Sequence, residues 1–281
     1  MDEIRKKITI GLPTYNREKH ISNLLDFLYI ELDALSVDDR NEIEIFISDN
    51  CSTDNTEQCI KESKLHKTEI VDITYFQQKT NTGLLGNLKY LYTTVNGEYL
   101  WIMGDDDEYK PGIVQQVLNE CKKDEYSYIF INHSTFTNGH ILDESVVKDL
   151  DVNRTDKELL WELYKKSGTV MMFVSACVSK TEYIKKYLNK NKVNLVTPCS
   201  LSFYCASKGK MKIIPEAMII DDYTNISWTK YQFQVFIIEI PQMLLKLPLW
   251  GYNCRECYSK GLRILWNNKK RVIKYFLKLD R

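Results

Sequence analysis

The chain has 281 residues, and its 38 basic and 38 acidic side chains cancel to a net charge of zero. This balance argues against a globally basic nucleic-acid-binding protein, and no zinc-finger or RNA-binding signature is present. The length suits one large domain, or a domain with a modest appendage. Because the charged start at residues 1–7 is not a signal peptide, we expect a cytoplasmic protein whose eight cysteines are reduced thiols.

Apolar segments with strand periodicity alternate with segments of helical periodicity along the first half of the chain. Helical spacing runs through residues 20–35, and another helix opens near Pro111 and continues to Cys121. Gly97 is placed as the stop of the helix before it. The predicted strands span residues 8–12, 43–47, 71–76, 99–103 and 128–131.

Such alternation predicts an α/β fold with a mainly parallel sheet and helices on both faces. In sheets of this kind, ligands bind beyond the carboxyl ends of the strands. Polar loops follow the first four predicted strands and should therefore meet at one edge. These loops span residues 13–18, 48–56, 81–87 and 104–108.

Three successive aspartates, Asp105, Asp106 and Asp107, follow the apolar strand at 99–103. On an extended backbone, Asp105 and Asp107 would face one side and Asp106 the other. Two carboxylates in one space raise each other's pKa unless they share a cation, and Mg²⁺ or Mn²⁺ is the natural partner. A plain polar turn is the alternative. Three further polar loops are expected at the same edge of the sheet, and this grouping favours the metal site over a plain turn.

The order and spacing of the four loops resemble the family-two glycosyltransferases of the GT-A fold. The asparagine-rich variants resemble the abequosyltransferase-like branch of bacterial surface-polysaccharide enzymes. The resemblance covers residues 8–135, with weaker support to about Trp228. It implies a Rossmann-like sheet, a nucleotide-sugar donor and a divalent metal, Mn²⁺ or Mg²⁺.

The resemblance also implies roles for residues in the four loops. Asp49 would hydrogen-bond the base, and Asn81 and Asn87 would approach the ribose and diphosphate. Asp107, together with Asp105, would ligate the cation. The implied nucleotide and donor contacts are Pro13, Thr14, Tyr15, Asn16, Glu18, Asp49, Asn81, Asn87, Asp105 and Asp106. Taken singly, these residues could be turn formers or helix caps.

The second half of the chain is expected to form the acceptor side. Thr155 begins a capping-box pattern that opens a helix to Lys166, and Ser179 or Thr181 opens another to about Asn189. Residues 170–178 and 211–215 are strand-like. Many relatives carry a Glu-Asp pair before a late helix as the catalytic base, but residues 191–200 contain no carboxylate.

The base that deprotonates the acceptor hydroxyl must therefore come from elsewhere. Asp221 and Asp222, after an apolar segment, are the first candidates, and a solvated strand end is the alternative. Neighbours in an extended segment face opposite sides, so one of them reaches the acceptor, and we favour Asp222. His133 is the next candidate. Trp228 could stack on an acceptor sugar or belong to the core.

The C-terminal segment is apolar at residues 235–250 but too interrupted to span a bilayer. Residues 260–281 are basic and amphipathic, which suits an anionic membrane surface, a solvated helix or a homodimer contact. Cys254 and Cys257 have zinc-ligand spacing without a second pair, so free thiols are favoured.

The expected organisation is a GT-A domain at 1–228, with a nucleotide-binding half at 1–110 and an acceptor half at 111–228, and a helical appendage at 229–281. The sequence predicts a metal-dependent, inverting glycosyltransferase of the cytoplasm or the inner membrane face. It would move a sugar from a nucleotide diphosphate, with UDP favoured by family frequency, to a growing surface glycan (capsule or lipopolysaccharide) or a lipid-linked glycan. The alternatives are a sugar nucleotidyltransferase, whose glycine-rich basic loop is missing at 13–18, and an inactive sugar-binding module.

Overall fold

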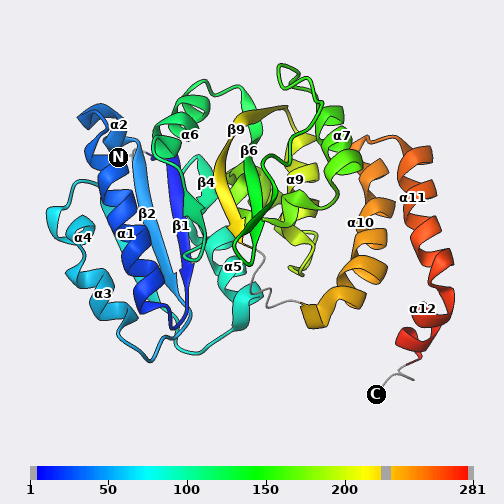
Figure 1. Ribbon diagram of the computed structural model, residues 1–281, viewed down its shortest axis with the longest axis horizontal. Helices are drawn as coiled ribbons and strands as arrows, with labels where there is room; N and C mark the ends of the chain where they lie inside the picture. Colours follow the sequence, from blue (N-terminus) through cyan, green and yellow to red (C-terminus); the bar gives the residue numbers. More distant parts are fainter. Residues whose placement is uncertain (1–4, 223–228, 278–281) are drawn as a thin grey trace.

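The computed structural model describes residues 5–222 and 229–277 and consists of a central sheet with helices on both faces (Figure 1). The strands are β1 Ile8–Thr14, β2 Ile43–Asp49, β3 Asp72–Gln77, β4 Tyr99–Ile102, β5 Glu108–Tyr109, β6 Tyr126–Thr137, β7 His140–Asp143, β8 Cys177–Lys180 and β9 Lys210–Asp222. The first helices are α1 Glu18–Asp33, α2 Val37–Asn41, α3 Thr56–Glu62, α4 Lys64–Thr68, α5 Gly83–Thr94 and α6 Ile113–Lys122. The later helices are α7 Lys157–Ser167, α8 Thr181–Leu188, α9 Thr197–Ala206, α10 Ile240–Lys246, α11 Cys254–Asn267 and α12 Lys269–Phe276.

The sheet has the strand order β3-β2-β1-β4-β8-β6-β9-β5, and β7 pairs with β6. Strands β1 to β4 run parallel, and so do β6 and β9, whereas β8 runs antiparallel to both β4 and β6. The expectation of an α/β fold with a mainly parallel sheet is confirmed. The reversed central strand was not foreseen.

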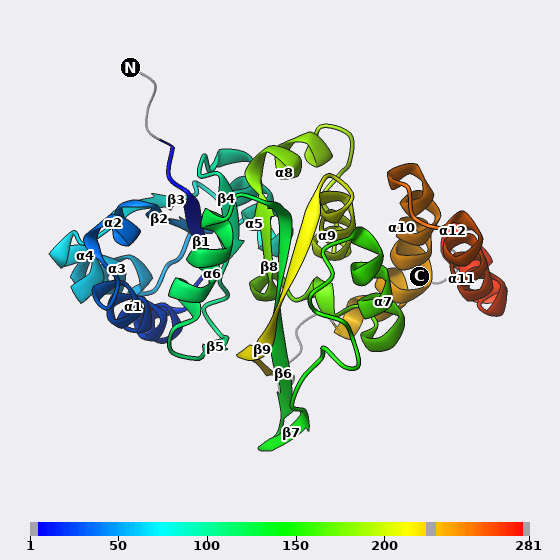
Figure 2. The same cartoon turned by 90° about the horizontal axis from the view of Figure 1, so that it is seen from above.

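Alternating side chains of β4 divide between two hydrophobic cores. Tyr99 and Trp101 belong to the core formed with α1 and α6, and Leu100 and Ile102 belong to the core formed with α5 and α7 to α10. Figure 2 shows the two groups of helices on opposite faces of the sheet. Burial on both faces explains why this strand is a continuous apolar run.

Gly97 is not the helix stop that its position predicted. α5 ends at Thr94, and Val95 is already extended. The Gly97 amide donates to the hydroxyl of Thr9, and a Cβ at this position would lie 2.3 Å from that oxygen. The glycine is therefore required by close approach to β1.

One helix start and one strand also differ from expectation. α7 begins at Lys157, and Asp156 at its N-cap binds Arg154, so the capping box at Thr155 is wrong. Of the two starts expected for the next helix, Thr181 is confirmed: α8 begins there, and Ser179 lies inside β8. Most of the strand expected at 170–178 is replaced by two 3₁₀ turns, Val170–Met172 and Val174–Ala176.

The C-terminal helices extend away from the sheet, and each contacts the helix before it in the chain. Val235, Leu244 and Tyr252 join the core around α7 and α9, and α11 packs on α10. Within residues 5–222 and 229–277, no helix combines the length and apolarity needed to cross a bilayer. Cys254 is exposed and Cys257 buried, and both are free thiols. Trp228 lies outside the described residues.

Candidate active site

Direct hydrogen bonds join the four polar loops to one another. Asn16 accepts from the Thr53 amide at 2.8 Å, which joins the first loop to the second. The Asn50 side chain donates to Asn81 at 2.9 Å, which joins the second loop to the third. Thr14 donates from its hydroxyl to Asp105 at 2.8 Å, which joins the first loop to the fourth. The four strand ends therefore form one connected surface.

The first loop depends on an unusual backbone at Asn16. Its φ of 51° is left-handed, a conformation that asparagine tolerates better than most residues. The turn brings the backbone amides of Arg17 and Glu18 to Thr56 and Asp54 in the second loop. The Arg17 guanidinium then forms an ion pair with Asp106 at 3.1 Å.

The three aspartates do not alternate along an extended strand as the sequence predicted, because Asp105 and Asp106 form a turn after β4. Asp105 is turned toward Thr14 of β1, and Asp106 is exposed beside Arg17. Asp107 accepts a hydrogen bond from the hydroxyl of Ser175. The three carboxylates thus have three different partners.

Ser175 and Gly104 hold the Asp107 carboxylate in place. The Gly104 amide donates to the Ser175 hydroxyl at 3.0 Å, and the Ser175 carbonyl accepts from the Trp101 indole at 2.8 Å. The Tyr109 hydroxyl lies 3.4 Å from the same carboxylate. A Cβ at Gly104 would lie 2.4 Å from Asp107 Oδ2, so only glycine leaves room for this arrangement.

Burial raises the pKa of two of the three aspartates. The pKa of Asp105 rises to about 6, mainly through loss of solvent, and the Thr14 hydrogen bond and the Arg17 charge counteract part of the rise. The pKa of Asp107 rises to about 7 through loss of solvent, with further contributions from the charges of Asp106 and Asp221. Carboxylates whose pKa values are raised by burial are frequent at functional sites.

Strand pairing brings Asp221 to the acidic loop. β5 pairs antiparallel with β9, with Glu108 opposite Ile220 and Tyr109 opposite Ile219. Continuing this register by one position sets Asp107 opposite Asp221, which agrees with the effect of the Asp221 charge on the pKa of Asp107. Asp221 is buried and Asp222 exposed. Of the two base candidates, the structure brings Asp221, not the favoured Asp222, to the site.

His133 lies in β6 with its ring against Phe173, 4.8 Å between ring centroids. Its side chain is fully buried, and burial lowers its pKa to about 4. A neutral imidazole that is closed off from solvent does not reach an acceptor hydroxyl. The structure therefore argues against His133 as the base.

The Asp49 carboxylate is fully buried and accepts three hydrogen bonds. Its donors are the Ser52 amide at 2.8 Å, the Tyr75 hydroxyl at 2.8 Å and the Gln77 side chain at 3.1 Å. Gln77 itself is exposed. Of the three donors, the exposed Gln77 side chain is therefore the one that lies between the carboxylate and solvent.

The remaining predicted donor residues differ in exposure. Tyr15, Asn16 and Asn81 are exposed, and the side chain of Glu18 accepts from Asn55. Pro13, at the end of β1, is partly buried. Asn87 is buried, and its side-chain NH₂ donates to the Ser48 carbonyl at 3.0 Å while its side-chain oxygen accepts from the Ser48 hydroxyl at 2.6 Å. In this structure Asn87 holds the end of β2 against α5 and lies beneath the loop surface.

The donor set fits a divalent cation only in part. Among the described residues, no three His, Cys, Asp or Glu side chains are grouped so as to hold a metal ion. Asp107 and Asp105 supply hard oxygen donors with raised pKa values, and one or two carboxylates suffice for Mg²⁺ when substrate phosphates complete the shell. The residues therefore fit a cation that arrives with a diphosphate.

Three residues that the sequence did not single out contribute to this surface. Arg17 supplies the cation beside Asp106, and Ser175 and Tyr109 contact Asp107. Arg17 lies inside the first polar loop, between Asn16 and Glu18, so its position was a usable signal. Ser175 lies in a segment expected to be a strand, and no neighbouring residue in the sequence indicated a role in the site.

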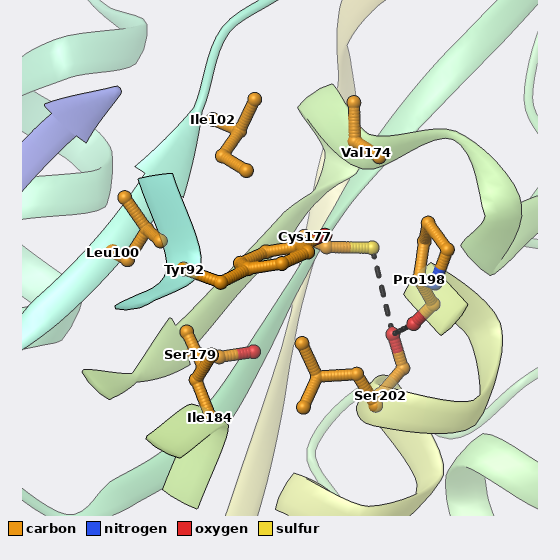
Figure 3. A pocket seen from close by; sticks show the side chains of 10 residues that line it. Tyr92, Leu100, Ile102, Val174, Cys177, Ser179, Ile184, Pro198 and Ser202 are labelled. Carbon is orange, nitrogen blue, oxygen red and sulfur yellow. Dashed lines mark hydrogen bonds between the residues drawn. The ribbon is translucent and has the colours of Figure 1, made fainter. Parts of the chain in front are cut away.

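A small internal cavity lies apart from these loops, between α5, β8 and α9. Figure 3 shows Tyr92, Ile102 and Pro198 around it, with Cys177 accepting a hydrogen bond from Ser202 at 3.6 Å. Its volume of about 20 Å³ holds about one water molecule. It is too small for a nucleotide or a sugar.

The sequence profile described as glycosyl transferase family 2 matches residues 9–175, a range that contains all four loops and Ser175. The chain belongs to glycosyl transferase family 2. The family-two match ends before β9, so Asp221 lies outside it. Membership confirms the resemblance seen in the motifs.

Curated relatives match parts of this family-two chain. The abequosyltransferase RfbV of Salmonella typhimurium is 35% identical over 100 residues, which are 36% of this chain and 28% of the relative. The poly(ribitol-phosphate) beta-N-acetylglucosaminyltransferase TarS of Staphylococcus aureus is 25% identical over 223 residues, 72% of this chain and 36% of TarS. In both relatives, the matched part covers less than half of the protein's length.

Solved structures share the fold of this family-two chain. Residues 1–349 of S. aureus TarS in complex with UDP-GlcNAc superpose with a TM-score of 0.65 at 14% identity, covering 92% of this chain and 72% of that one. The mannosyltransferase PcManGT of Pyrobaculum calidifontis, in complex with GDP-Man and Mn²⁺, gives a TM-score of 0.54 at 13% identity, covering 95% and 76%. At these identities the likeness establishes the fold alone.

Replacing Gly104 with Ala should disturb the acidic loop selectively. The new Cβ would overlap Asp107 Oδ2, so the carboxylate must leave its place beside Ser175. A misplacement of about 1 Å can cost about a hundredfold in rate, and we expect a loss of that order. Donor turnover and thermal unfolding of the variant would be measured together.

Gly209→Ala is the matched control, because its Cβ would meet only the Ser127 side chain at 3.3 Å, outside the four loops. It should keep wild-type turnover. Equal turnover of the Gly104→Ala variant would mean that Asp107 does not need the observed position.

Proposed function

We propose that this protein is a metal-dependent, inverting glycosyltransferase that moves a sugar from a nucleotide-diphosphate donor to a growing surface glycan. The observation that carries the proposal is the pair of partly buried strand-end aspartates, Asp105 and Asp107, within four interlinked loops of a family-two chain. The curated relatives support a bacterial glycan acceptor, and the UDP-GlcNAc complex of TarS supports UDP as the donor nucleotide.

The first half of the chain, residues 1–110, supplies the donor site in this proposal. Pro13, Thr14 and Tyr15 line the nucleotide, and Tyr15 is exposed enough to contact the base directly. Asn81 and the start of α5 approach the ribose and diphosphate, and Asn87 supports them from beneath. Asn16 and Glu18 act by holding the first loop against the second.

Asp49 hydrogen-bonds the base once Gln77 has moved away from it. The buried carboxylate is oriented by Ser52 and Tyr75, so it is ready to accept a hydrogen bond from an N–H of the base. Gln77 is exposed and covers this position when no base is bound.

Asp107 is the proposed metal ligand, and Asp105 is the second carboxylate of the motif. Mn²⁺ or Mg²⁺ bound here would neutralise the diphosphate and stabilise its charge as it leaves. Because Asp105 lies against Thr14 of the nucleotide loop, it also reaches the ribose or the donor sugar. Arg17 adds a positive charge on the same side.

Asp221 takes the acceptor proton in the proposed reaction. The acceptor oxygen forms a bond to the anomeric carbon, the bond from that carbon to the diphosphate breaks, and the hydroxyl proton passes to the Asp221 carboxylate. Attack from the side opposite the leaving group inverts the anomeric centre. Ser175 and Tyr109 act as positioning residues through Asp107.

In this proposal we assign residues 111–228 to the acceptor side and residues 229–281 to a C-terminal appendage, whose described part, residues 229–277, is helical. The relative from Campylobacter jejuni, 22% identical over 154 residues, is a glucosyltransferase named for an undecaprenol-linked glycan. Its name supports a lipid-linked glycan as the acceptor, and we place the transfer on the cytoplasmic side of the membrane.

A donor-hydrolysis screen tests this function. Purified protein is incubated with UDP-, GDP-, CDP-, ADP- and dTDP-sugars with and without Mn²⁺, and release of the nucleoside diphosphate is measured. We expect Mn²⁺-dependent release of the nucleoside diphosphate from one class of donor, and we expect that class to be the UDP-sugars. Absence of release and of binding for all of them would contradict the proposal.

Replacing Asp49 with Ala should weaken nucleotide affinity more than it slows turnover of the bound donor. A hydrogen bond to a charged group is worth roughly 1.5–3 kcal/mol, which corresponds to about ten- to a hundredfold in affinity. Calorimetric titration with the free nucleoside diphosphate measures the loss. Because three donors lose their acceptor, circular dichroism must show that the variant is folded at the titration temperature.

Gln77→Ala separates base binding from local structure. Gln77 only covers Asp49 in this proposal, so its removal should leave affinity within about threefold of wild type. An unchanged dissociation constant for Asp49→Ala would restrict Asp49 to a structural role in its loop.

A further inference from the structure

Helices α11 and α12 present large apolar side chains to solvent. Trp266 is 69% exposed, and Ile273 and Phe276 are 56% and 61% exposed. Leu262 lies one helical turn before Trp266 on the same stripe of α11, and it is also exposed. Side chains of this size are usually buried, so four of them exposed on two consecutive helices indicate an interaction site.

One side of α11 packs against α10. Cys257 and Gly261 are buried against α10, and a Cβ at Gly261 would lie 3.3 Å from the Pro241 carbonyl. No residue within α12 is buried. Tyr275 and Arg271 of α12 contact the Phe233 ring, but Leu262, Trp266, Ile273 and Phe276 remain exposed. Figure 1 shows α11 and α12 at the end of the molecule opposite α3 and α4.

Basic side chains surround the exposed apolar ones. Between positions 257 and 277 the sequence has six basic residues and no acidic residue. Lys269 lies over the Trp266 ring at 4.1 Å, and Lys270 and Arg271 line a surface hollow at the bend between the helices together with Trp266. We define the C-terminal amphipathic surface as Leu262, Arg263, Trp266, Lys269, Lys270, Ile273 and Phe276.

We propose that the C-terminal amphipathic surface docks on an anionic membrane. Apolar side chains flanked by lysine and arginine are suited to a bilayer interface, where the rings enter the headgroup region and the cations meet lipid phosphates. A second copy of the chain fits less well, because the cores of protein interfaces are depleted of lysine and two such basic surfaces would repel each other. Charge complementarity selects the anionic lipid surface.

Docking would hold the loop surface near acceptors that are anchored in the same membrane. This purpose rests on the proposed function, whereas docking itself does not. The binding test below uses no donor and no acceptor, so its failure is distinct from a failure of the transferase proposal.

Co-sedimentation with lipid vesicles tests the proposal on the full chain. Wild-type protein should bind vesicles containing phosphatidylglycerol, bind vesicles of phosphatidylcholine alone much more weakly, and dissociate as salt is raised. Arg263→Glu with Lys270→Glu should reduce binding to the anionic vesicles at least about tenfold. Ile273→Asp with Phe276→Asp should reduce it similarly, because it removes the apolar contact.

Lys67→Glu with Lys89→Glu is the matched control, since it makes the same charge change at exposed positions on α4 and α5. This control should bind as wild type, and donor hydrolysis in solution should be unchanged in all three double variants. Equal loss in the control, or no binding by wild type, would overturn the proposal. Dimerisation in light scattering that the Ile273→Asp, Phe276→Asp variant abolishes, without vesicle binding, would assign the surface to a second copy and also overturn it.

Discussion

Replacing Asp107 with Asn is expected to reduce sugar transfer by about 10³-fold or more while leaving the protein folded. The substitution removes the proposed metal ligand, and metal stabilisation of the leaving diphosphate is worth several kcal/mol, or about a factor of ten for each 1.4 kcal/mol. The amide can still accept the Ser175 hydrogen bond, so the loop should keep its shape. Turnover and circular dichroism would be measured at saturating Mn²⁺.

The same variant should be more stable than the wild type when no metal is present. Asp107 holds its proton more tightly in the folded chain, where its pKa is about 7, than at the ordinary value of 3.8. The folded state therefore binds more protons between these values, and its stability falls as pH rises from about 4 to about 7. Above pH 7 we expect Asp107→Asn to raise the free energy of unfolding by about 1–3 kcal/mol.

Thermal unfolding at pH 4 and pH 8 in the presence of a chelator measures this effect. The variant and the wild type should be equally stable at pH 4 and separate at pH 8. Asp106→Asn is the control, because Asp106 is exposed and ion-paired with Arg17. Retained transfer by the Asp107→Asn variant would remove Asp107 from the metal site.

Replacing Asp221 with Asn should slow transfer by about two to four orders of magnitude and leave donor binding nearly unchanged. General-base catalysis acts on the acceptor hydroxyl in the transition state and does not contribute to ground-state binding of the donor. Transfer to the acceptor and calorimetric binding of the nucleoside diphosphate would be measured on the same preparation.

Asp222→Asn supplies the matched comparison, because the neighbouring residue is exposed and faces away from Asp221 along β9. It should keep transfer within a few-fold of wild type. A larger loss at Asp222 than at Asp221 would restore the choice made from the sequence, and full activity in both variants would place the base on another residue.

The four polar loops within residues 1–110 could be predicted because their signals are local. Strand periodicity ending in Pro13, Asp49 and Gly104 locates three strand ends, and parallel topology then brings the loops to one edge. Helix stops and caps were less predictable. Gly97 looks like a stop in the sequence, but its requirement comes from Thr9, which is far away in the chain.

The support and the base of the site depend on contacts that are distant in sequence. Ser175 contacts Asp107 because two 3₁₀ turns precede the reversed strand β8. The hydrophobic periodicity of the sequence does not predict such turns. The choice between Asp221 and Asp222 depends on the pairing of β9 with the two-residue strand β5. A shift of one residue in that register exchanges the two side chains.

The central claim, that the four loops bind a nucleotide diphosphate together with a metal, is tested most directly by a crystal structure. Crystals would be grown with Mn²⁺ and the tightest-binding nucleoside diphosphate, and the anomalous signal of manganese would be mapped. We predict a manganese peak bonded to the Asp107 carboxylate and to the diphosphate, with the base at Asp49. A nucleotide bound outside the four loops, or a manganese ion without contact to the acidic loop, would contradict the claim.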